Sequence, residues 1–444
     1  MNDSHSDAAS DVRMHGFSRR HTVRAALEWL DAHLHLLAAE TVPLSAAVNR
    51  VLAVPVISDV DVPGFDRATM DGYAVVADDT EGASSYNRVP LKVVGTAMPG
   101  APFVGTMHRG EVVRIMTGAP RPCGSDAVLP AEFVEAGDDA NRIGAIAVVS
   151  PGKNIGRCGE DIAAGTVVLS NGRLLRPQDL GVMSSIGVGE ATVVRRPRVR
   201  LIVTGNELLP AGSRPHDFLI TDANGPMLAA LIERDGGIVD FPGLVRDDPD
   251  AIRAALGPPT GSPYDRQGAN DSNVPNLSNV SNDPNDANDI VIVSGGSSVG
   301  VEDLAPMLVA AQGELTVHGI AMRPSSPTGL GRIGNRLVFL LPGNPVSALC
   351  AYDFFAGRAI RALGGRSKEW PYRSIRAPLA RKISSQIGRV DYARVKLENG
   401  RVEPLSVSGA SVLSSTTRAD GFVVIDDDSE GFPAGAEIDV WLYA

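Results

Sequence analysis

Three glycine-containing loops follow hydrophobic runs and carry residue types that hold phosphate groups. They read T-G-N-E at 204–207, S-G-G-S-S-V-G at 294–300 and P-G-N-P at 342–345. Glycine lets the backbone approach a ligand closely, and free backbone N–H groups at the carboxyl edge of a parallel sheet bind phosphate. The loops favour a phosphate or pyrophosphate pocket, although the second one also fits an ordinary strand-to-helix turn capped by Asp303. The candidate ligand-binding residues of these loops are Ser294, Gly295, Gly296, Ser297, Gly343 and Asn344.

Acidic residues cluster in the same part of the chain, and carboxylate oxygens are the preferred ligands of hard cations such as Mg²⁺. They are Glu207, Asp222, Asp247, Asp248, Glu302 and Asp303. Asp247 and Asp248 precede Pro249 and are typical of the start of a helix. Glu207 and Asp303 follow strands, so they are the better metal candidates.

A basic segment, A-M-R-P-S-S-P-T-G at 321–329, supplies Arg323 and two hydroxyl groups for an oxyanion. The string G-x-x-x-x-G-K-[ST] does not occur, which disfavours P-loop chemistry, and the single G-x-G-x-x-G, at 329–334, neither follows an expected strand directly nor opens an expected helix, which disfavours nicotinamide chemistry. No Ser–His or Cys–His arrangement indicates covalent catalysis. The residues alone therefore indicate a metal-assisted enzyme, or a binding protein, for a phosphorylated or anionic ligand.

Composition excludes several classes of protein. The chain has 444 residues, enough for two to four domains, and a net charge of −11 that argues against binding to nucleic acid or an acidic membrane. Its three cysteines are far apart in sequence, which suits a reducing cytoplasm and predicts no zinc site. No apolar run is long enough for a membrane span, and residues 1–18 resemble a disordered tail and not a signal peptide.

Hydrophobic spacing predicts the elements that must position these residues. An amphipathic helix is expected over 19–40, capped by Thr22 and ended by Pro43, and a β-rich region over 50–195. From 198 onward strands alternate with helices, which is typical of a doubly wound, mostly parallel sheet. The expected strands are 198–204, 237–245, 290–293, 315–321 and 337–341, and the expected helices are 222–234, 250–256, 304–311 and 346–363. The Asn- and Asp-rich run 257–289 is expected to be a disordered insertion, and the chain beyond 366 a small barrel or sandwich.

Seven motifs in order resemble the MoeA/gephyrin-type molybdopterin molybdenumtransferases. They are M-D-G-Y-A, R-I-M-T-G-A-P, G-E-D-I-x-x-G, T-G-N-E-L, R-D-D-P, S-G-G-S-S-V-G-x-x-D and L-P-G-N-P-V-S. The resemblance runs from about residue 20 to the end of the chain. It implies insertion of molybdate into adenylylated molybdopterin with release of AMP, using Mg²⁺.

The resemblance also implies an assembly and a domain plan. Family members are homodimers whose site lies between the α/β and C-terminal domains of one subunit and the β-rich domain of the other. An upstream adenylyltransferase and downstream molybdoenzymes are the expected partners. The predicted domains are a tail at 1–18, a linker and dimerisation domain at 19–54 and 149–195, a β-rich domain at 55–148, a three-layer molybdopterin-binding α/β domain at 196–366, and a C-terminal β-barrel at 367–444.

The family's site residues map onto this chain motif by motif. Asp71 and Thr117 are the expected catalytic residues on the partner side of the site, and Glu207 and Asp303 those on the α/β side. The residues expected to bind substrate are Asp161, Asp222, Asp247, Asp248, Arg323, Pro324, Ser326, Ser347 and Arg389, together with those of the glycine loops. Of the two adjacent acids Asp247 and Asp248, the resemblance does not choose one.

The chain departs from the family pattern at several positions. Asn206 stands where an aspartate is usual, which removes one negative charge, and Ser326 stands where a second lysine is usual. Leu304 replaces a common tyrosine, and Gly409-Ala410 a Gly-Ser pair. These departures motivate an alternative in which the protein binds molybdopterin as a carrier or scaffold without turnover. Tungstate in place of molybdate is a further variant that the sequence leaves open.

Overall fold

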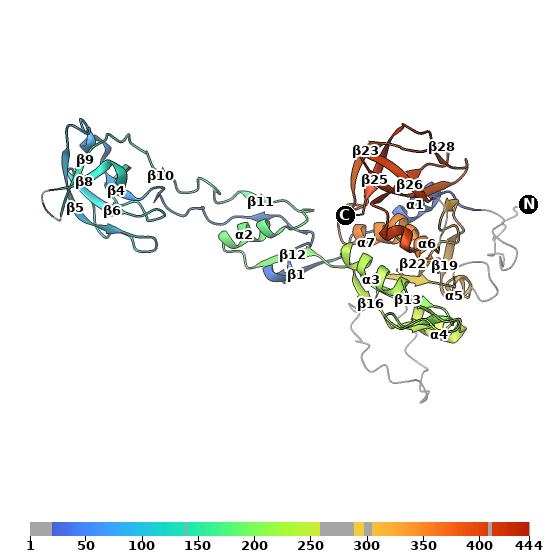
Figure 1. The fold of residues 1–444 in the computed structure, drawn as a ribbon. Helices are drawn as coiled ribbons and strands as arrows, with labels where there is room; N and C mark the ends of the chain where they lie inside the picture. The colour runs from blue at the N-terminus through green and yellow to red at the C-terminus, as the bar shows by residue number, and fades with distance from the viewer. Residues whose placement is uncertain are drawn as a thin grey trace, which may run out of the picture. The chain divides into compact units, whose positions relative to one another are not determined.

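The computed structural model describes residues 20–137, 139, 141–257, 288–296, 304–406 and 411–443. Contacts divide the chain into two compact units, shown in Figure 1 and described separately below. Unit 2 is Thr41–Val193, and unit 1 joins the chain up to Glu40 to Val194–Ala444. No helix in the described ranges has the length and apolar character needed to cross a membrane. The predicted tail at 1–18 and nearly all of the predicted insertion at 257–289 lie outside the described residues.

Unit 1 is built on a seven-stranded mixed sheet. Its strands are β13 (Arg198–Thr204), β16 (Ile238–Asp240), β17 (Leu244–Val245), β18 (Ile290–Ser294), β19 (Glu314–His318), β21 (Gly329–Ile333) and β22 (Arg336–Leu341). Parallel pairing joins β16, β17, β13, β18 and β22. At one edge of the sheet, β21 pairs antiparallel with β22 and with β19. The predicted mostly parallel sheet is therefore a mixed sheet, parallel from β16 to β22 and antiparallel at the β21–β19 edge. β21 was not predicted because Gly329 and Gly331 interrupt its apolar run.

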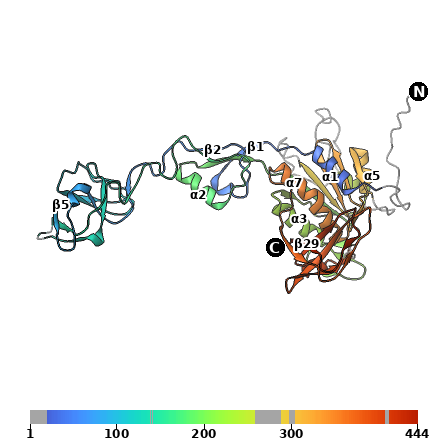
Figure 2. The same cartoon turned by 90° about the horizontal axis from the view of Figure 1, so that it is seen from above.

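Helices cover both faces of this sheet. α3 (Asn224–Arg234) contacts β13, α6 (Pro345–Ala351) and α7 (Gly357–Leu363), and Figure 2 shows α3 beside α7 from above. α4 (Pro249–Leu256) and α5 (Ala305–Gln312) pack together on the sheet, where their apolar side chains meet Val291 and Val293 of β18. The alternate residues Ile290 and Ile292 are also fully buried, so they face the opposite side. The four β-branched residues of β18 thus form a strand buried on both faces, as predicted.

Two predicted helices of unit 1 differ from the structure. α1 (Val23–Ala32) begins after the predicted cap, with the Thr22 hydroxyl accepting the Ala25 N–H at 3.1 Å, but it ends well before residue 40. The chain is extended again in β1 (Ala39–Pro43), so the helix does not run on to Pro43. The predicted helix over 346–363 is interrupted between α6 and α7 by a π-helical turn, η5 (Tyr352–Ala356). The short strands β14 (Leu208–Leu209) and β15 (Ile220–Thr221) form a separate parallel pair.

The C-terminal part of unit 1 is a second mixed sheet. Its strands are β20 (Met322–Arg323), β23 (Arg373–Pro378), β25 (Val390–Glu398), β26 (Arg401–Ser406), β27 (Gly421–Ile425) and β29 (Glu437–Leu442). β24 (Ile383–Ser384) pairs with β28 (Gly431–Phe432), and α8 (Ser414–Thr417) precedes β27. β20 comes from the predicted α/β domain but pairs in parallel with β25. Through this pairing the basic segment at 321–329 joins the C-terminal sheet, and the predicted barrel closure stays a prediction.

Unit 2 contains a six-stranded sheet with a hydrophobic core on each face. Its order is β7 (Ala127–Pro130), β4 (Gly72–Val75), β6 (Glu111–Ile115), β5 (Val89–Ala97), β9 (Arg142–Ala145) and β8 (Val134–Ala136). One core gathers Val75, Val112 and Leu129, and the other gathers Ala74, Val113 and Ile115. This alternation confirms the predicted β-rich character of the region.

The rest of unit 2 consists of two-stranded sheets and one α-helix, α2 (Pro177–Ser185). β2 (Val56–Ile57) pairs with β11 (Val167–Leu169), β3 (Arg67–Ala68) with β10 (Ile155–Gly156), and β1 with β12 (Glu190–Val194). Short 3₁₀ turns lie at Leu44–Ala46, Ala77–Thr80 and Ala131–Phe133. Leu52, Leu175 and Met183 are buried in its own core. The finer domain boundaries within each unit stay predictions.

Candidate functional site

The three glycine-containing loops of unit 1 begin at one edge of the α/β sheet. β13, β18 and β22 are neighbouring parallel strands, with Val203 opposite Ser294 and Ser294 opposite Leu341. Because the strands run in the same direction, the loops after Thr204, Ser294 and Leu341 all leave from the carboxyl edge. The structure therefore brings together the starts of the loops that the sequence singled out.

Asp247 ties the T-G-N-E loop to the chain that precedes α4. Its Oδ1 accepts a hydrogen bond from the Thr204 hydroxyl at 2.5 Å, and its Oδ2 accepts one from the Asn206 backbone N–H at 3.1 Å. The Asn206 side-chain oxygen in turn accepts the Asp247 N–H at 3.3 Å. The residue that departs from the family pattern thus retains an acceptor at this position but carries no charge.

The adjacent acid, Asp248, serves a different purpose. Its Oδ1 accepts the backbone N–H groups of Asp250 and Ala251 at 3.1 and 2.9 Å, which makes it the N-cap of α4. The structure thus separates the two acids that the sequence could not distinguish, because Asp247 binds the edge loop and Asp248 the helix.

The S-G-G loop is pressed against the end of β13. Gly295 has φ +99°, and a Cβ atom there would lie 2.2 Å from the Thr204 carbonyl oxygen. Its N–H donates to the Leu341 carbonyl at 3.2 Å. Only glycine fits this position without displacing the backbone. Ser297 and Asp303, later in the same loop, lie outside the described residues, as does Glu302.

Asn224, which the sequence reasoning missed, joins the other two loops. Its Nδ2 donates to the Ser294 hydroxyl at 2.9 Å and to the Gly343 carbonyl at 2.8 Å. The residue is 6% exposed, and its Oδ1 is buried with no hydrogen-bond partner among the described residues. A buried acceptor left unpaired beside a ligand loop is available to a donor on the ligand. The only signal for Asn224 was its place at the start of a predicted helix.

The two remaining predicted acids of this edge, Asp222 and Glu207, differ in burial. Asp222 is buried, and its Oδ1 accepts the Gly225 N–H at 2.9 Å, so it supports the first turn of α3. Glu207 has an exposed side chain, while its carbonyl accepts the Ile220 N–H at 2.9 Å. Among the residues that the structure describes, no three His, Cys, Asp or Glu side chains are grouped closely enough to hold a metal ion. The described acids therefore do not complete the metal site that was predicted at Glu207 and Asp303.

Two predicted oxyanion-binding arginines meet at a buried aspartate. Arg323 forms a two-pronged ion pair with Asp391, its Nε lying 3.1 Å from Oδ1, and Arg389 Nε lies 3.2 Å from the same oxygen. The Ser385 hydroxyl donates to Oδ2 at 2.8 Å. Asp391 is fully buried, so it fixes both arginines while the cluster keeps one net positive charge. Asp391 was missed, although it lies in the same G-R-V-D-Y-A-R string as Arg389.

The serines and proline next to Arg323 pack against the start of α6. Ser325, with φ +90°, donates its hydroxyl to the Ser347 carbonyl at 2.5 Å. Pro324 and Ser347 are buried, and the Ser326 Oγ is buried without a partner among the described residues. The P-G-N-P loop leaves Gly343 and Asn344 exposed before α6. The Ser326 hydroxyl is thus an unsatisfied donor in the same segment as Arg323.

In unit 2, Asp71 and Thr117 form a closed pair. Oδ1 of Asp71 accepts both the backbone N–H and the hydroxyl of Thr117, each at 2.7 Å. The backbone hydrogen bond, and then the hydroxyl, hold the pKa of the Asp71 carboxyl below its ordinary value. Both donors use the same oxygen, so Oδ2 remains free of Thr117. The next residue, Gly72, must be a glycine, because a Cβ atom there would lie 2.1 Å from the Leu129 carbonyl oxygen.

Asp161, which the resemblance also predicts as a site residue, belongs to unit 2 but, among the described residues, shares no hydrogen bond with Asp71 or Thr117. Its backbone N–H donates to Val62 at 3.1 Å, and its side chain is exposed. The two neighbouring acids Asp61 and Asp66 accept backbone N–H groups of Ala164 and Cys158. The loop of Asp161 is thus held by acids that the sequence reasoning did not select.

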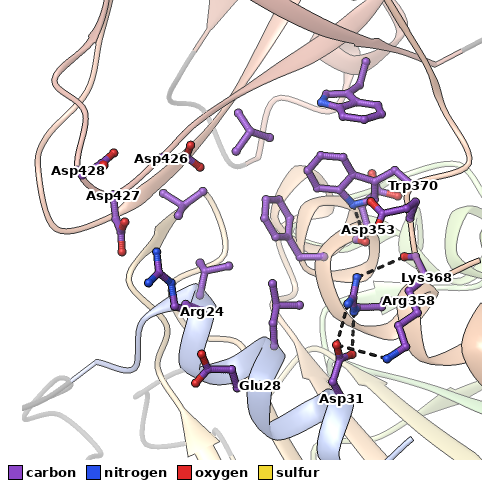
Figure 3. A pocket seen from close by; sticks show the side chains of 17 residues that line it. Arg24, Glu28, Asp31, Asp353, Arg358, Lys368, Trp370, Asp426, Asp427 and Asp428 are labelled. Atoms are coloured by element: carbon purple, nitrogen blue, oxygen red, sulfur yellow. Dashed lines mark hydrogen bonds and ion pairs between the residues drawn. The ribbon is translucent and has the colours of Figure 1, made fainter.

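A pocket of about 740 Å³ in unit 1 lies between α1, η5 and the C-terminal strands (Figure 3). On one wall Arg358 and Lys368 both pair with Asp31, at 2.8 and 3.4 Å. Asp353 is fully buried at its inner end, where Tyr372 donates to it at 2.9 Å. Burial raises the pKa of Asp353 to about 6, against the lowering effect of Arg234. The sequence reasoning missed this acid because it sits in the middle of an apolar predicted helix.

Comparisons with known proteins agree along the whole chain. Three family models match in succession: the MoeA N-terminal region (domain I and II) at residues 21–187, a probable molybdopterin binding domain at 200–362, and the MoeA C-terminal region (domain IV) at 376–443. Molybdopterin molybdenumtransferase 2 of Mycobacterium tuberculosis is 35% identical over 410 residues, covering 90% of this chain and 94% of that protein. A molybdopterin molybdenumtransferase of Staphylococcus aureus is 29% identical over 95% of both chains. The crystal structure of a molybdopterin biosynthesis MoeA protein from Pyrococcus horikosii has a TM-score of 0.76 and 33% identity, covering 96% of this chain and all of that one.

Proposed function

Since this chain belongs to the MoeA family of molybdopterin molybdenumtransferases, we propose that it inserts molybdate into adenylylated molybdopterin and releases AMP in a Mg²⁺-dependent reaction. The matches to known molybdopterin molybdenumtransferases confirm the family that the seven motifs resemble, and with it a role in molybdenum cofactor biosynthesis. The substrate form, the ion and the released nucleotide are the part that is proposed.

One observation carries the proposal on the α/β side: all three glycine-containing loops leave the same edge of the sheet, and hydrogen bonds join the second loop to the third. Asp247 bonds the first loop to the chain before α4, and Asn224 bonds the second loop to the third. The carboxyl edge of a parallel sheet presents backbone N–H groups to a phosphate. This supports a phosphorylated pterin as the ligand.

The arginine cluster supports an oxyanion as the second substrate. Molybdate is a dianion, which needs cationic or hydroxyl donors to leave water. Arg323 and Arg389, held by Asp391, provide one net positive charge, and the unpaired Ser326 hydroxyl provides a donor. A serine at this position gives an oxyanion a hydrogen bond in place of the charge that a lysine would give.

The proposal includes a homodimer in the cytoplasm, in which unit 2 of the partner subunit brings its Asp71 and Thr117 to the substrate. The ligands of Mg²⁺ stay a prediction that includes Glu207 and Asp303, because the described residues do not form a metal site by themselves. When bound, the ion would neutralise phosphate charge as AMP leaves.

A second function, binding of molybdopterin as a carrier without turnover, is favoured by the loss of two charges from the family pattern. Asn206 and Ser326 remove one negative and one positive charge, respectively, from the family pattern, and Arg323 is already paired with Asp391. A site with weaker charges can bind a substrate yet stabilise its transition state less. Turnover separates the two functions.

The test is AMP release and cofactor maturation by purified protein given adenylylated molybdopterin, molybdate and Mg²⁺. Wild type is expected to turn over, and chelation of the ion is expected to stop it. Asp247→Asn is expected to lower the rate about tenfold or more, since a charged acceptor of two loop donors is replaced by a neutral one. Wild-type protein that binds the substrate without releasing AMP would establish the carrier function instead.

Asp248→Asn is the matched control, one residue away. Asparagine caps helices as well as aspartate does, so the unfolding temperature and the rate are both expected to stay near wild type. An equal loss of rate in both variants would show that Asp247 has no special place in the site.

A further inference from the structure

The pocket of about 740 Å³ in unit 1 is separate from the residues assigned to the substrate. None of the residues of the glycine-containing loops or of the arginine cluster lines it. Its walls come from α1 on one side, from η5 and α7 on another, and from the C-terminal strands β25, β27 and β29 on a third. This volume lies in the range of small-molecule sites, so the pocket can hold a ligand of its own.

Aromatic side chains form one wall of this pocket. The Trp370 ring meets the rings of Phe354 and Trp441 edge-on, with centroid distances of 5.2 and 5.1 Å. Trp370 Nε1 donates to the Asp353 carbonyl at 3.0 Å, which fixes the orientation of the indole. Both tryptophans line the pocket and are only partly buried, so they offer aromatic surface to a ligand.

The lining of the pocket carries an excess of negative charge. Seven acidic side chains line it against three basic ones, and two of the basic ones, Arg358 and Lys368, are paired with Asp31 at 2.8 and 3.4 Å. Across the pocket from that cluster lies the acidic loop 426–428, three consecutive aspartates that Figure 3 labels. Within the described part of the chain, none of these three carboxylates forms an ion pair. The loop therefore presents unpaired negative charge beside an aromatic wall.

We propose that this pocket binds a small organic cation, a protonated amine on an aromatic body, with the body against Trp370 and Trp441 and the ammonium group beside the acidic loop. Aromatic rings and carboxylates both attract an ammonium group, whereas an anion would be repelled by the excess of acidic side chains. Molybdate and the adenylylated pterin are anions, so this ligand is of a different class from the substrates. The inference goes beyond the proposed function and does not rest on it.

The experiment measures equilibrium binding of three probes of similar shape to the full-length protein by calorimetry at neutral pH. The probes are phenethylamine, which is a cation, 2-phenylethanol, which is neutral, and 3-phenylpropanoate, which is an anion. Wild type is expected to bind the cation about tenfold more tightly than either of the others, as for one cation–π contact together with one partly exposed ion pair. Replacing all three aspartates of the acidic loop by asparagine is expected to remove this preference and to leave binding of the neutral probe unchanged.

The control variant removes the same charge from the same sheet outside the pocket. It combines Glu398→Gln, Glu437→Gln and Asp439→Asn, three exposed residues that do not line the cavity. This variant is expected to bind the three probes as wild type does. Unfolding temperatures of both triple variants check that the fold is retained.

Three outcomes overturn the inference. One is the absence of saturable binding of phenethylamine to wild type, and another is equal affinity for the three probes, which would mean that the charge of the pocket selects nothing. The third is an equal loss of phenethylamine binding in both triple variants, which would assign the effect to the net charge of the protein. None of these measurements uses turnover, so they stand apart from the test of AMP release.

Discussion

At the scale of single residues, Thr117 holds the pKa of the Asp71 carboxyl below its ordinary value. Its backbone N–H and its hydroxyl both lower the pKa of the Asp71 carboxyl, the backbone bond having the larger effect. Thr117→Val keeps the shape and the backbone donor but removes the hydroxyl. We expect the pKa of Asp71 to rise, so the acid limb of the activity profile moves to higher pH and activity near that limb falls severalfold.

A pH–rate profile of wild type and Thr117→Val measures this shift. Thr166→Val is the control, since the Thr166 hydroxyl is exposed and donates to a backbone carbonyl in the same unit. Coincident acid limbs for wild type and Thr117→Val would show that ionised Asp71 is not required for turnover.

Asn224 has a positioning task that a charged residue of the same shape cannot perform. A carboxylate has no donor for the Gly343 carbonyl, and its charge would face the phosphate that the loops are proposed to bind. Asn224→Asp is therefore expected to raise the KM for adenylylated molybdopterin about tenfold and to lower stability by about 1–3 kcal/mol.

The matched comparison is Asn288→Asp, in a half-buried asparagine that precedes β18 at the other end of the strand. Asn288 Nδ2 donates to Asp240 at 3.1 Å, so this change also costs stability, but it is expected to leave KM near wild type. The same rise in KM for both variants would assign the effect of Asn224 to general loosening of the sheet.

At the scale of elements, the π-helical turn η5 carries a buried acid whose ionisation opposes folding. Burial raises the pKa of Asp353 from 3.8 to about 6, so the folded protein holds more protons than the unfolded chain between these values. The stabilising contribution is present below about pH 4 and is lost as pH rises through about 6, an effect of up to about 3 kcal/mol. Asp353→Asn is expected to flatten this part of the stability curve.

Denaturant unfolding between pH 4 and pH 8 measures the contribution of Asp353, and unfolding below about pH 4 measures the opposite case, Asp31→Asn. Arg358 lowers the pKa of Asp31, so the contribution of Asp31 is present above the unfolded pKa and is lost as pH falls. The two variants should therefore change the slope of stability against pH in opposite directions. Equal slopes for wild type and Asp353→Asn would show that Asp353 keeps its ordinary pKa.

The elements also show where sequence patterns suffice. β13 has the residues that hydrophobic spacing predicted, because its burial depends on local periodicity. α1 is shorter than predicted and the helix after P-G-N-P is broken at η5, since polar Asp353 and its tyrosine partners are brought together only by the tertiary fold. The antiparallel edge of the first sheet and the pairing of β20 with β25 depend on contacts between distant segments.

The candidate site divides in the same way. Strand-end loops could be predicted because parallel strands place their ends at one edge. The family resemblance predicted Asp71, Thr117, Arg323 and Arg389 as site residues, and their roles stay predictions. The positioning partners Asn224 and Asp391 were missed, since a buried amide or carboxylate is recognised by what surrounds it. The choice between Asp247 and Asp248 likewise needed the hydrogen bonds.

At the scale of the whole molecule, the proposed homodimer predicts that two inactive variants can complement each other. If the site takes Asp71 from one subunit and Asp247 from the other, then Asp71→Asn and Asp247→Asn disable different halves of each site. A mixed dimer then has one site with both changes and one site with neither. After subunit exchange of an equal mixture, half the dimers are mixed and half of their sites are intact, so about a quarter of wild-type activity is expected to return.

The measurement is AMP release by each variant alone and by the mixture after unfolding and refolding together. Asp247→Asn mixed with Asn224→Asp is the control, because both changes lie on the α/β side and every site in a mixed dimer carries one of them. That mixture is expected to show no more than the average of its two components, whereas the first mixture exceeds both of its components. If the first mixture also shows only the average, Asp71 and Asp247 act in the same subunit or the protein is not a dimer, and sedimentation of the wild type distinguishes these two cases.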